Sequence, residues 1–197
     1  LPTISISIDT TKPRVAEAAL DAGADLVNDI WGTGPGGADL AALAAVRRVP
    51  LLVMHNRVRP VYDDVVAEVI ADLDAALERA VGLGVPWDRI IVDPGIGFGK
   101  TADHNVAVLH DLAALCVLGR PILLGTSRKS TLGRILDLPP DERLEATLAT
   151  TALGIAAGVD IVRVHDVAAN VRAARVADAV VRGNWRAEPE GAIGGTP

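Results

Sequence analysis

Six short apolar runs along the chain each end in residues whose side chains could do chemistry. Asp9, Asn28 and Asp93 offer hydrogen-bond acceptors, and Asn28 also donors, that suit the amide and amino edge of a flat heterocycle. Lys129 and Arg163, after the fifth and sixth runs, add cations. Together these groups predict a site for a small polar substrate.

Anion-binding and titratable groups accompany them. Ser130 is expected just inside a helix start, where free backbone amides and the helix dipole favour a carboxylate or a phosphate. His55 and His165 are expected to titrate near neutral pH or to bind phosphate. The glycine-rich run at residues 95–99 indicates a loop that moves or approaches a ligand closely. It is not a dinucleotide fingerprint, because no helix-opening GxGxxG follows the first strand.

Purely structural interpretations stay open for several of these residues. They are a helix cap for Asp9 with Thr11, a turn cap for Asn28, a core position for Met54, an ordinary turn for Asp93 with the next two residues, and an ion pair of Arg163 with Asp166. The occurrence of polar residues at all six strand ends favours a binding site. Helix and turn capping alone hardly explains why six strand ends carry polar residues that would share one opening, since a buried charge is costly without a partner.

The elements that would position these groups alternate between β-branched runs and longer helical stretches, the pattern of parallel strands covered by crossover helices. The sequence predicts strands at residues 4–9, 25–29, 50–55, 89–93, 121–125 and 160–164. It predicts helices at residues 13–22, 38–47, 62–83, 105–118, 129–136 with 141–157, and 167–181. Glycines close several helices shortly before a strand, and this recurrence resembles an internal structural repeat.

These units predict an α/β fold, a TIM (β/α)8 barrel with about six of its eight β/α units in this chain, and a site at the carboxyl ends of the strands. Because a complete barrel commonly needs about 250 residues, we expect the first two units to be missing at the amino end. We expect one barrel domain over residues 1–184 and a flexible tail over residues 185–197. An open arc leaves two unpaired edges, which a partner or a second copy would have to cover.

Composition restricts the classes of function. The chain has 197 residues, 50% of them hydrophobic, and a net charge of −6, so it has no basic field for nucleic acid or anionic lipid. Its single cysteine, Cys116, excludes an internal disulfide and favours a reducing compartment, and we expect a cytoplasmic protein. No long apolar run or signal-peptide pattern indicates a membrane role. We therefore expect small-molecule substrates as its partners.

The strand-end segments resemble signatures of the dihydropteroate synthase family, a family of folate-pathway transferases, in the same order across essentially the whole chain. The matching segments are Ser7-Ile8-Asp9-Thr10, Val27-Asn28-Asp29-Ile30, Val53-Met54-His55, Asp93-Pro94-Gly95-Ile96-Gly97-Phe98-Gly99-Lys100, Ser127-Arg128-Lys129-Ser130 and Arg163-Val164-His165-Asp166. One segment alone would be weak evidence, whereas six in register are specific.

The resemblance implies condensation of 6-hydroxymethyl-7,8-dihydropterin pyrophosphate with para-aminobenzoate, giving 7,8-dihydropteroate and pyrophosphate. By position, the pterin would be held by residues from several strand ends: Asp9, Asn28, Met54, Asp93, Lys129 and Arg163. Phe98 and Ser130 would receive para-aminobenzoate, and His165 with Asn28 would lie near the departing pyrophosphate. The residues assigned to catalysis would be Lys129, Arg163 and Asp93.

One departure from the family pattern concerns its amino-terminal segment, with an Asn-Val-Thr-Pro-Asp-Ser-Phe-Ser type loop and an arginine-bearing loop, which this sequence does not contain. In the family these loops complete the pyrophosphate and magnesium site, so Mg²⁺ is the expected cofactor but none of its ligands is expected in this chain. We expect the isolated chain to bind pterin weakly and to turn over slowly or not at all. The resemblance also implies a homodimer.

Two alternatives stay open. A pterin-binding methyltransferase domain shares the barrel and the pterin-edge residues, although the Ser127-Arg128-Lys129-Ser130 string favours the synthase. An inactive, truncated barrel that serves as a binding or interaction module is the non-enzymatic alternative.

Overall fold

Parallel strands alternate with helices along the whole chain in a computed structural model that describes residues 4–34, 36–183 and 185. The strands are β1 (Ser7–Asp9), β2 (Leu26–Asp29), β3 (Leu51–Met54), β4 (Ile90–Asp93), β5 (Leu123–Leu124) and β6 (Ile161–Val162). The α-helices are α1 (Pro13–Asp21), α2 (Gly37–Arg47), α3 (Val65–Gly82), α4 (Ala102–His110), α5 (Ser130–Leu136), α6 (Leu144–Ala156) and α7 (Val167–Arg182). Short 3₁₀ helices lie at η1 (Trp87–Arg89), η2 (Leu112–Leu118) and η3 (Pro140–Glu142).

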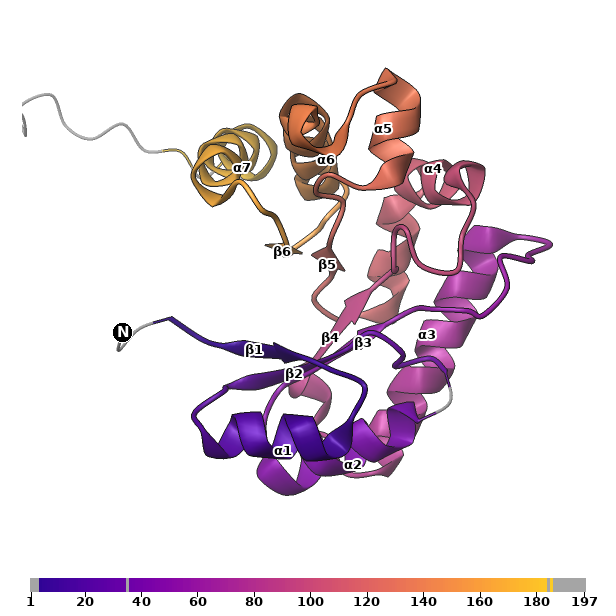
Figure 1. The fold of residues 1–197 in the computed structure, drawn as a ribbon, viewed down its shortest axis with the longest axis vertical. Helices are drawn as coiled ribbons and strands as arrows, with labels where there is room; N and C mark the ends of the chain where they lie inside the picture. The colour runs from indigo at the N-terminus through magenta and orange to yellow at the C-terminus, as the bar shows by residue number, and fades with distance from the viewer. Residues whose placement is uncertain (1–3, 35, 184, 186–197) are drawn as a thin grey trace, which may run out of the picture.

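The strands form an arc in chain order. Strands β1 to β4 make one parallel sheet and β5 pairs with β6 in a second, and a bridge between Val92 and Ile122 joins the two. In the described part of the chain β1 and β6 are each hydrogen-bonded on one side only, and the arc is open between them (Figure 1). The prediction of six barrel units is confirmed. Most of the predicted tail, residues 186–197, and residue 184 before it lie outside the described residues.

The same arrangement connects two of the helices, α1 and α6, to the strand that follows. Gly23 and Gly158 follow α1 and α6 with φ of 104° and 100°, a backbone conformation that glycine adopts without strain. Two residues later, Asp25 and Asp160 accept hydrogen bonds from backbone amides at the start of the preceding strand, at 2.7 Å from Ile6 N and 3.0 Å from Ile122 N. The recurring junctions in the sequence are therefore structural repeats.

The helix predicted at residues 105–118 is wrong in its extent. Helix α4 begins three residues earlier because Thr101 and His104 form a capping box, and it ends at His110. The remainder is the 3₁₀ helix η2, where Leu112, Leu115 and Leu118 are buried. Their spacing of three matches the three residues per turn of a 3₁₀ helix, so one face of η2 packs on the core.

Helix α3 starts at Val65, three residues later than predicted, because the Asp64 side chain accepts hydrogen bonds from Val66 N and Ala67 N. Tyr62, predicted inside the helix, instead donates its hydroxyl hydrogen to Gly99 O at 2.8 Å. This contact ties the segment after β3 to the glycine loop after β4.

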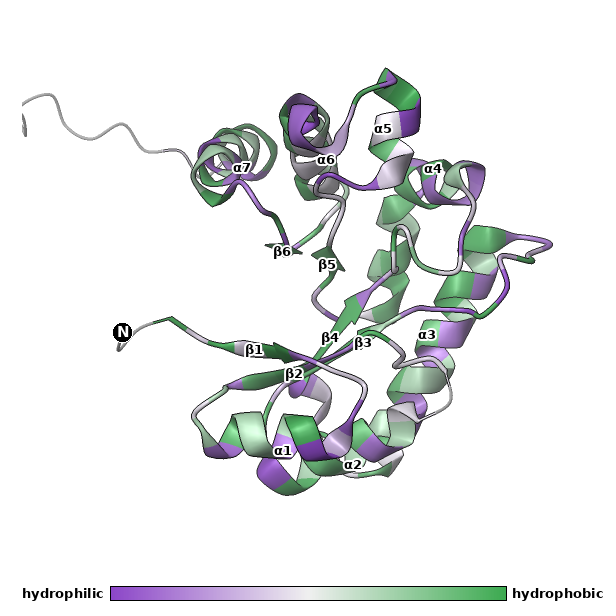
Figure 2. Ribbon diagram, viewed as in Figure 1, coloured by the Kyte–Doolittle hydropathy of each residue, from purple (hydrophilic) through white to green (hydrophobic). Residues whose placement is uncertain are grey.

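The main hydrophobic core lies between the strands and the helices that cover their outer side, and a small apolar cluster fills the inside of the arc. Figure 2 shows hydrophobic residues along the strands and mixed faces on the helices. At the open edge, Ile4 and Ile6 are exposed. None of the helices in the described part of the chain is long and apolar enough to cross a membrane.

Candidate functional site

Three polar side chains link the two ends of the open arc. Strand register places Asp9 opposite Asn28, whose Nδ2 donates to Asp9 Oδ2 at 3.2 Å. Arg163, one residue beyond β6, donates from Nη2 to the same oxygen at 3.0 Å. The Arg163 and Asp9 side chains are 62% and 40% exposed, so this ion pair adds only about 0–1 kcal/mol of stability. It holds polar groups together where a ligand can reach them.

Two structural alternatives for these residues are wrong. Asp9 caps no helix, because α1 starts at an N-cap residue, Lys12, without a side-chain cap. Arg163 does not pair with Asp166, which instead binds the Arg128 guanidinium at 2.8 and 3.1 Å. That bidentate pair anchors the backbone at Arg128, whose φ is 58°.

Asn28 has an unused acceptor. Its side chain is buried, and Oδ1 has no hydrogen-bond partner among the described residues. A buried polar atom without a partner costs roughly 1–3 kcal/mol. A ligand N–H that reached this oxygen would remove that cost.

Asp93 ends β4 and is buried. Its Oδ1 accepts from Gly95 N at 2.7 Å, so the carboxylate also closes the turn that was the alternative interpretation. Burial raises the pKa of Asp93, while the Gly95 hydrogen bond and Lys129, Lys100 and Arg163 oppose the rise. The second oxygen, Oδ2, faces the space above Gly125, where a Cβ would lie 4.0 Å from both Asp93 Oδ2 and Lys129 Nζ.

A polar pocket of about 230 Å³ opens at this point. It is lined by Gly125, Ser127, Lys129, Arg163, Val164 and His165. Burial lowers the pKa of Lys129 to about 8, and its amino group lies 4.6 Å from the centre of the Phe98 ring and donates to Ile96 O. Ser127 Oγ lies 2.8 Å from His165 Nδ1 and accepts from His165 N, which fixes the imidazole at the pocket wall.

An adjoining pocket of about 250 Å³ runs into the interior of the arc. Its walls are mostly apolar: Ser7, Leu26, Asn28, Leu52, Ile91, Leu123, Ile161, Val162 and Arg163. Arg163 lines both pockets, so a cation lies between a polar mouth and an apolar interior. This arrangement suits a flat ring with a polar edge.

Other predicted residues lie around these pockets rather than in their walls. Met54 is buried in the interior cluster with Leu52 and Leu123, and Phe98 packs against that cluster. Ser130 begins α5 as predicted and is exposed. His55 is wholly enclosed by protein, so neither ligand contact nor free titration near neutral pH, as predicted from the sequence, fits its position.

Several residues that shape the site were not assigned a role from the sequence. Gly125 leaves the space that the ligand needs, and Ser127 orients His165. Arg143, at the start of α6, donates to the carbonyl oxygens of Arg128, Lys129 and Leu138 and so holds both ends of α5. The matched signature strings contain Ser127 but not Arg143, for which the sequence carries no signal.

The described residues contain no group of three or more His, Cys, Asp or Glu side chains that could hold a metal ion. The acidic residues at the site already have partners: Asp9 accepts hydrogen bonds from Asn28 and Arg163, and Asp93 accepts one from Gly95 N. The residues present therefore do not fit a divalent cation.

A family model described as pterin binding enzyme matches residues 1–165. Dihydropteroate synthase of Clostridium beijerinckii is 48% identical over 180 residues, which are 91% of this chain and 66% of the relative. That of Bacillus subtilis is 48% identical over 178 residues, 90% of this chain and 62% of the relative. The chain thus spans somewhat less than two thirds of these relatives.

Solved structures agree with the sequence relatives. Dihydropteroate synthase of Clostridium difficile, determined in the presence of pteroic acid, has a TM-score of 0.88 at 47% identity and aligns over 91% of this chain and 68% of its own. The enzyme of Thermus thermophilus in complex with 6HMPPP has a TM-score of 0.84 at 42% identity, covering 90% and 70%. The fold is therefore that of these TIM-barrel proteins.

Proposed function

Because this chain belongs to the pterin-binding enzyme family, we propose that it carries the pterin half of a dihydropteroate synthase site. The reaction joins 6-hydroxymethyl-7,8-dihydropterin pyrophosphate to para-aminobenzoate, giving 7,8-dihydropteroate and pyrophosphate. One observation carries the proposal: acceptors and cations gather at two adjoining pockets that share Arg163. Lys129 lines the polar pocket and Asn28, with its unused acceptor, lines the other, while Asp93 Oδ2 lies 4.0 Å from a Cβ placed on Gly125 in the polar pocket's wall.

The polar edge of the pterin meets acceptors at the strand ends. Asp93 and Asn28 accept from its amino and ring N–H groups, and Asp9 fixes Asn28 through the 3.2 Å hydrogen bond. Arg163 lies along the ring face, and Lys129 donates to a ring acceptor. Met54 supports the ring from the apolar cluster beneath.

The reaction requires positioning of the two substrates and stabilisation of charge more than it requires a strong base. The bond from the pterin methylene carbon to the pyrophosphate oxygen breaks, and the bonding electrons leave with pyrophosphate. The amine nitrogen of para-aminobenzoate forms the new bond to that carbon and then loses one proton. The Asp93 carboxylate stabilises positive charge on the pterin, and His165 with Asn28 lies beside the departing anion.

We assign the second substrate to the side of the pocket formed by Phe98 and Ser130. Phe98 offers an aromatic face beside the Lys129 amino group. Ser130 and the first amides of α5 offer hydrogen-bond donors to the carboxylate.

Magnesium stays a prediction from the family resemblance. The acidic residues of the site do not fit a divalent cation, and the steps above involve only side chains of this chain. The prediction that this chain alone turns over slowly or not at all stands with it, and measurable synthase activity of the purified chain with magnesium would contradict it.

Calorimetric titration with two ligands separates the proposed function from its alternatives. A dihydropterin pyrophosphate analogue should bind more tightly than a methylated tetrahydrofolate. The reverse order would support a methyltransferase domain. Binding of neither by the folded chain would support an interaction module.

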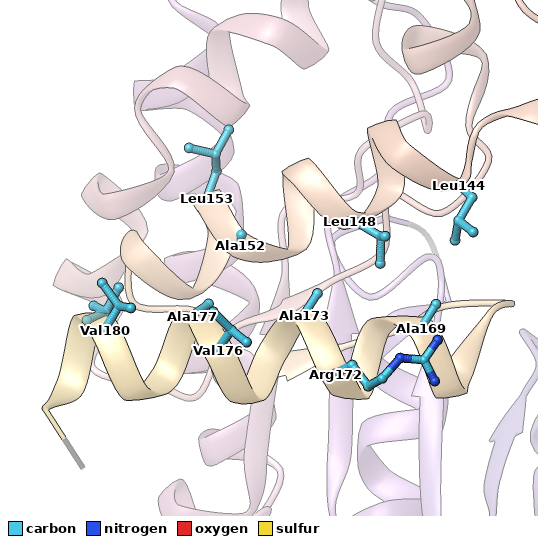
Figure 3. A pocket seen from close by; sticks show the side chains of 11 residues that line it. Leu144, Leu148, Ala152, Leu153, Ala169, Arg172, Ala173, Val176, Ala177 and Val180 are labelled. Carbon is cyan, nitrogen blue, oxygen red and sulfur yellow. The ribbon is translucent and has the colours of Figure 1, made fainter. Parts of the chain in front are cut away.

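We further propose that the chain forms a homodimer through the groove between α6 and α7. The groove encloses about 740 Å³ and is lined almost entirely by apolar side chains, as Figure 3 shows: Leu144, Leu148, Ala152, Leu153, Ala169, Arg172, Ala173, Val176, Ala177, Val180 and Val181. Val176 and Val180 are 66% and 78% exposed, which is unfavourable in water. A two-fold axis would cover the same face on both copies.

Sedimentation velocity tests the dimer. The wild-type chain should sediment as a dimer and Val176→Glu as a monomer. Val171→Glu, on the same helix but outside the groove, is the matched control and should leave the dimer intact. A wild-type monomer at high concentration would exclude this interface.

We also infer a cytoplasmic location, which the single unpaired cysteine supports. Cys116 is exposed and free, a state that suits a reducing compartment.

A further inference from the structure

A row of ionisable side chains lies beside the glycine loop at residues 94–100, and the proposed reaction uses none of them. Arg57 donates from Nε to Asp72 Oδ2 at 2.8 Å, and the same oxygen lies 3.1 Å from His55 Nε2. On the other side of the ring, His55 Nδ1 lies 2.7 Å from Lys100 Nζ. The row therefore runs from the surface of α3 to the last residue of the loop.

The contacts fix the state of the imidazole. Asp72 can only accept from Nε2–H, so Nδ1 carries the lone pair that accepts from Lys100. His55 is fully buried, and burial together with Lys100 lowers its pKa to about 4, which keeps the ring neutral at neutral pH. Lys100 then has a neutral acceptor in place of a repelling charge.

Lys100 uses its other two donors on the loop itself. Its Nζ donates to Gly95 O at 3.2 Å and to Phe98 O at 3.3 Å. An ammonium group has three donors, and here all three have partners. Burial lowers the pKa of Lys100 to about 7, whereas three acceptors around Nζ favour its ammonium form. Two carbonyl groups of one loop thus share a single buried amino group.

The loop is otherwise held by close backbone contacts and a few hydrogen bonds. A Cβ at Gly95 would lie 1.9 Å from His55 O, and one at Gly99 2.4 Å from Arg57 O, so its backbone rests directly on the end of β3. Both residues have positive φ and no side chain to pack. Besides Lys100, the hydrogen bonds from Gly95 N to Asp93, from Gly97 N to Asn105 and from the Tyr62 hydroxyl to Gly99 O constrain the loop.

This loop lies beside the site and contacts Lys129, which lines the polar pocket. It carries Phe98, whose ring packs on the interior cluster and lies 4.6 Å from Lys129 Nζ, and it presents Ile96 O to the same amino group. We propose that Lys100, oriented by His55 and Asp72, is a positioning residue that fixes the Phe98 ring where it contacts the second substrate, para-aminobenzoate. The inference rests on the proposed function for the identity of that substrate.

A fluorine spectrum tests the positioning without any ligand. Phe98 is the chain's single phenylalanine, so 4-fluorophenylalanine reports on this loop alone. The wild-type chain should give one sharp resonance, and Lys100→Met should shift it or split it into several lines. Lys12→Met, the same change at an exposed lysine, should leave it unchanged. An unchanged resonance in folded Lys100→Met would overturn the proposal.

The outer part of the row has its own test. Asp72→Asn changes no residue of the loop, but it weakens the hydrogen bond that His55 Nε2 donates. It should move the Phe98 resonance in the same direction by a smaller amount and alter the ¹⁵N shifts of the His55 ring. If neither signal moves, Asp72 and His55 have no part in positioning.

Binding measurements with two ligands then test whether the loop serves the benzoate half of the product, pteroic acid. Lys100→Met should bind pteroic acid about tenfold more weakly and bind 6-hydroxymethylpterin within about twofold of wild type. Equal losses for both ligands, or no loss for either, would overturn the assignment. If the wild-type chain binds neither ligand, the proposed function fails instead, and the fluorine spectra still decide whether Lys100 positions the loop.

Discussion

Asp93→Asn removes the acceptor on which the pterin site depends most. The amide oxygen of asparagine can still accept from Gly95 N, as Asp93 Oδ1 does at 2.7 Å, so the turn should survive. The second oxygen becomes an NH₂ group that faces the ligand. A hydrogen bond to a charged group contributes about 1.5–3 kcal/mol, and an unsatisfied buried donor costs about 1–3 kcal/mol. The loss is therefore about 3 kcal/mol or more, which weakens pterin binding at least about 100-fold.

Calorimetric titration with pteroic acid measures this loss, and a thermal unfolding curve checks the fold. Asp88→Asn is the matched control, because Asp88 is exposed and precedes the same strand at the opposite end of the barrel. The substitution should also lower the pKa of Lys129 below about 8, since Asp93 is the group that raises it. Wild-type affinity in a folded Asp93→Asn variant would refute the assignment of this carboxylate to the ligand.

Three further predictions follow from the site and its surroundings. Gly125→Val should abolish pterin binding without loss of stability, because its side chain extends from a Cβ position 3.9 Å from Arg163 Cβ and 4.0 Å from Asp93 Oδ2; unchanged calorimetric affinity would contradict this. The His55 pKa is about 4 in the fold against 6.5 for an ordinary histidine, so the unfolded chain takes up the proton first and stability falls as pH is lowered from 6.5 to 4; denaturant titrations should show a weaker fall in His55→Gln. Pterin affinity should drop as pH rises through about 8, where Lys129 loses its charge, and a titration that stays flat from pH 7 to 9 would exclude Lys129 from the contact.

Much of the fold could be predicted because parallel strands and crossover helices leave a strong pattern. The strand positions followed from the apolar runs, and the closeness of Asp9 and Asn28 followed from the rule that strand ends share one edge. Strands β5 and β6 are shorter than predicted, at two residues each, since the ladder between them is short and, among the described residues, β6 has no neighbour on its other side. The pattern of residues along a run gives no measure of how many neighbours a strand has.

The site was harder to predict where a role depends on burial or on a distant partner. His55 has a residue type and a strand-end position that suit phosphate binding, but Asp72 and Lys100 enclose it from both sides. Arg163 lies three residues before Asp166 in sequence, yet its partner is Asp9, 154 residues away. Such pairings arise from tertiary packing, which local sequence does not encode.

If the strand-end residues of this chain form a pterin site, a crystal structure of the chain with pteroic acid should show the ligand bound to them. The pterin ring should lie over Gly125, with its polar edge on Asp93 and Asn28, Arg163 along its face and the benzoate half beside Phe98. Pteroic acid bound elsewhere, for instance in the groove between α6 and α7, with the space over Gly125 empty, would show that the strand-end residues are not a pterin site.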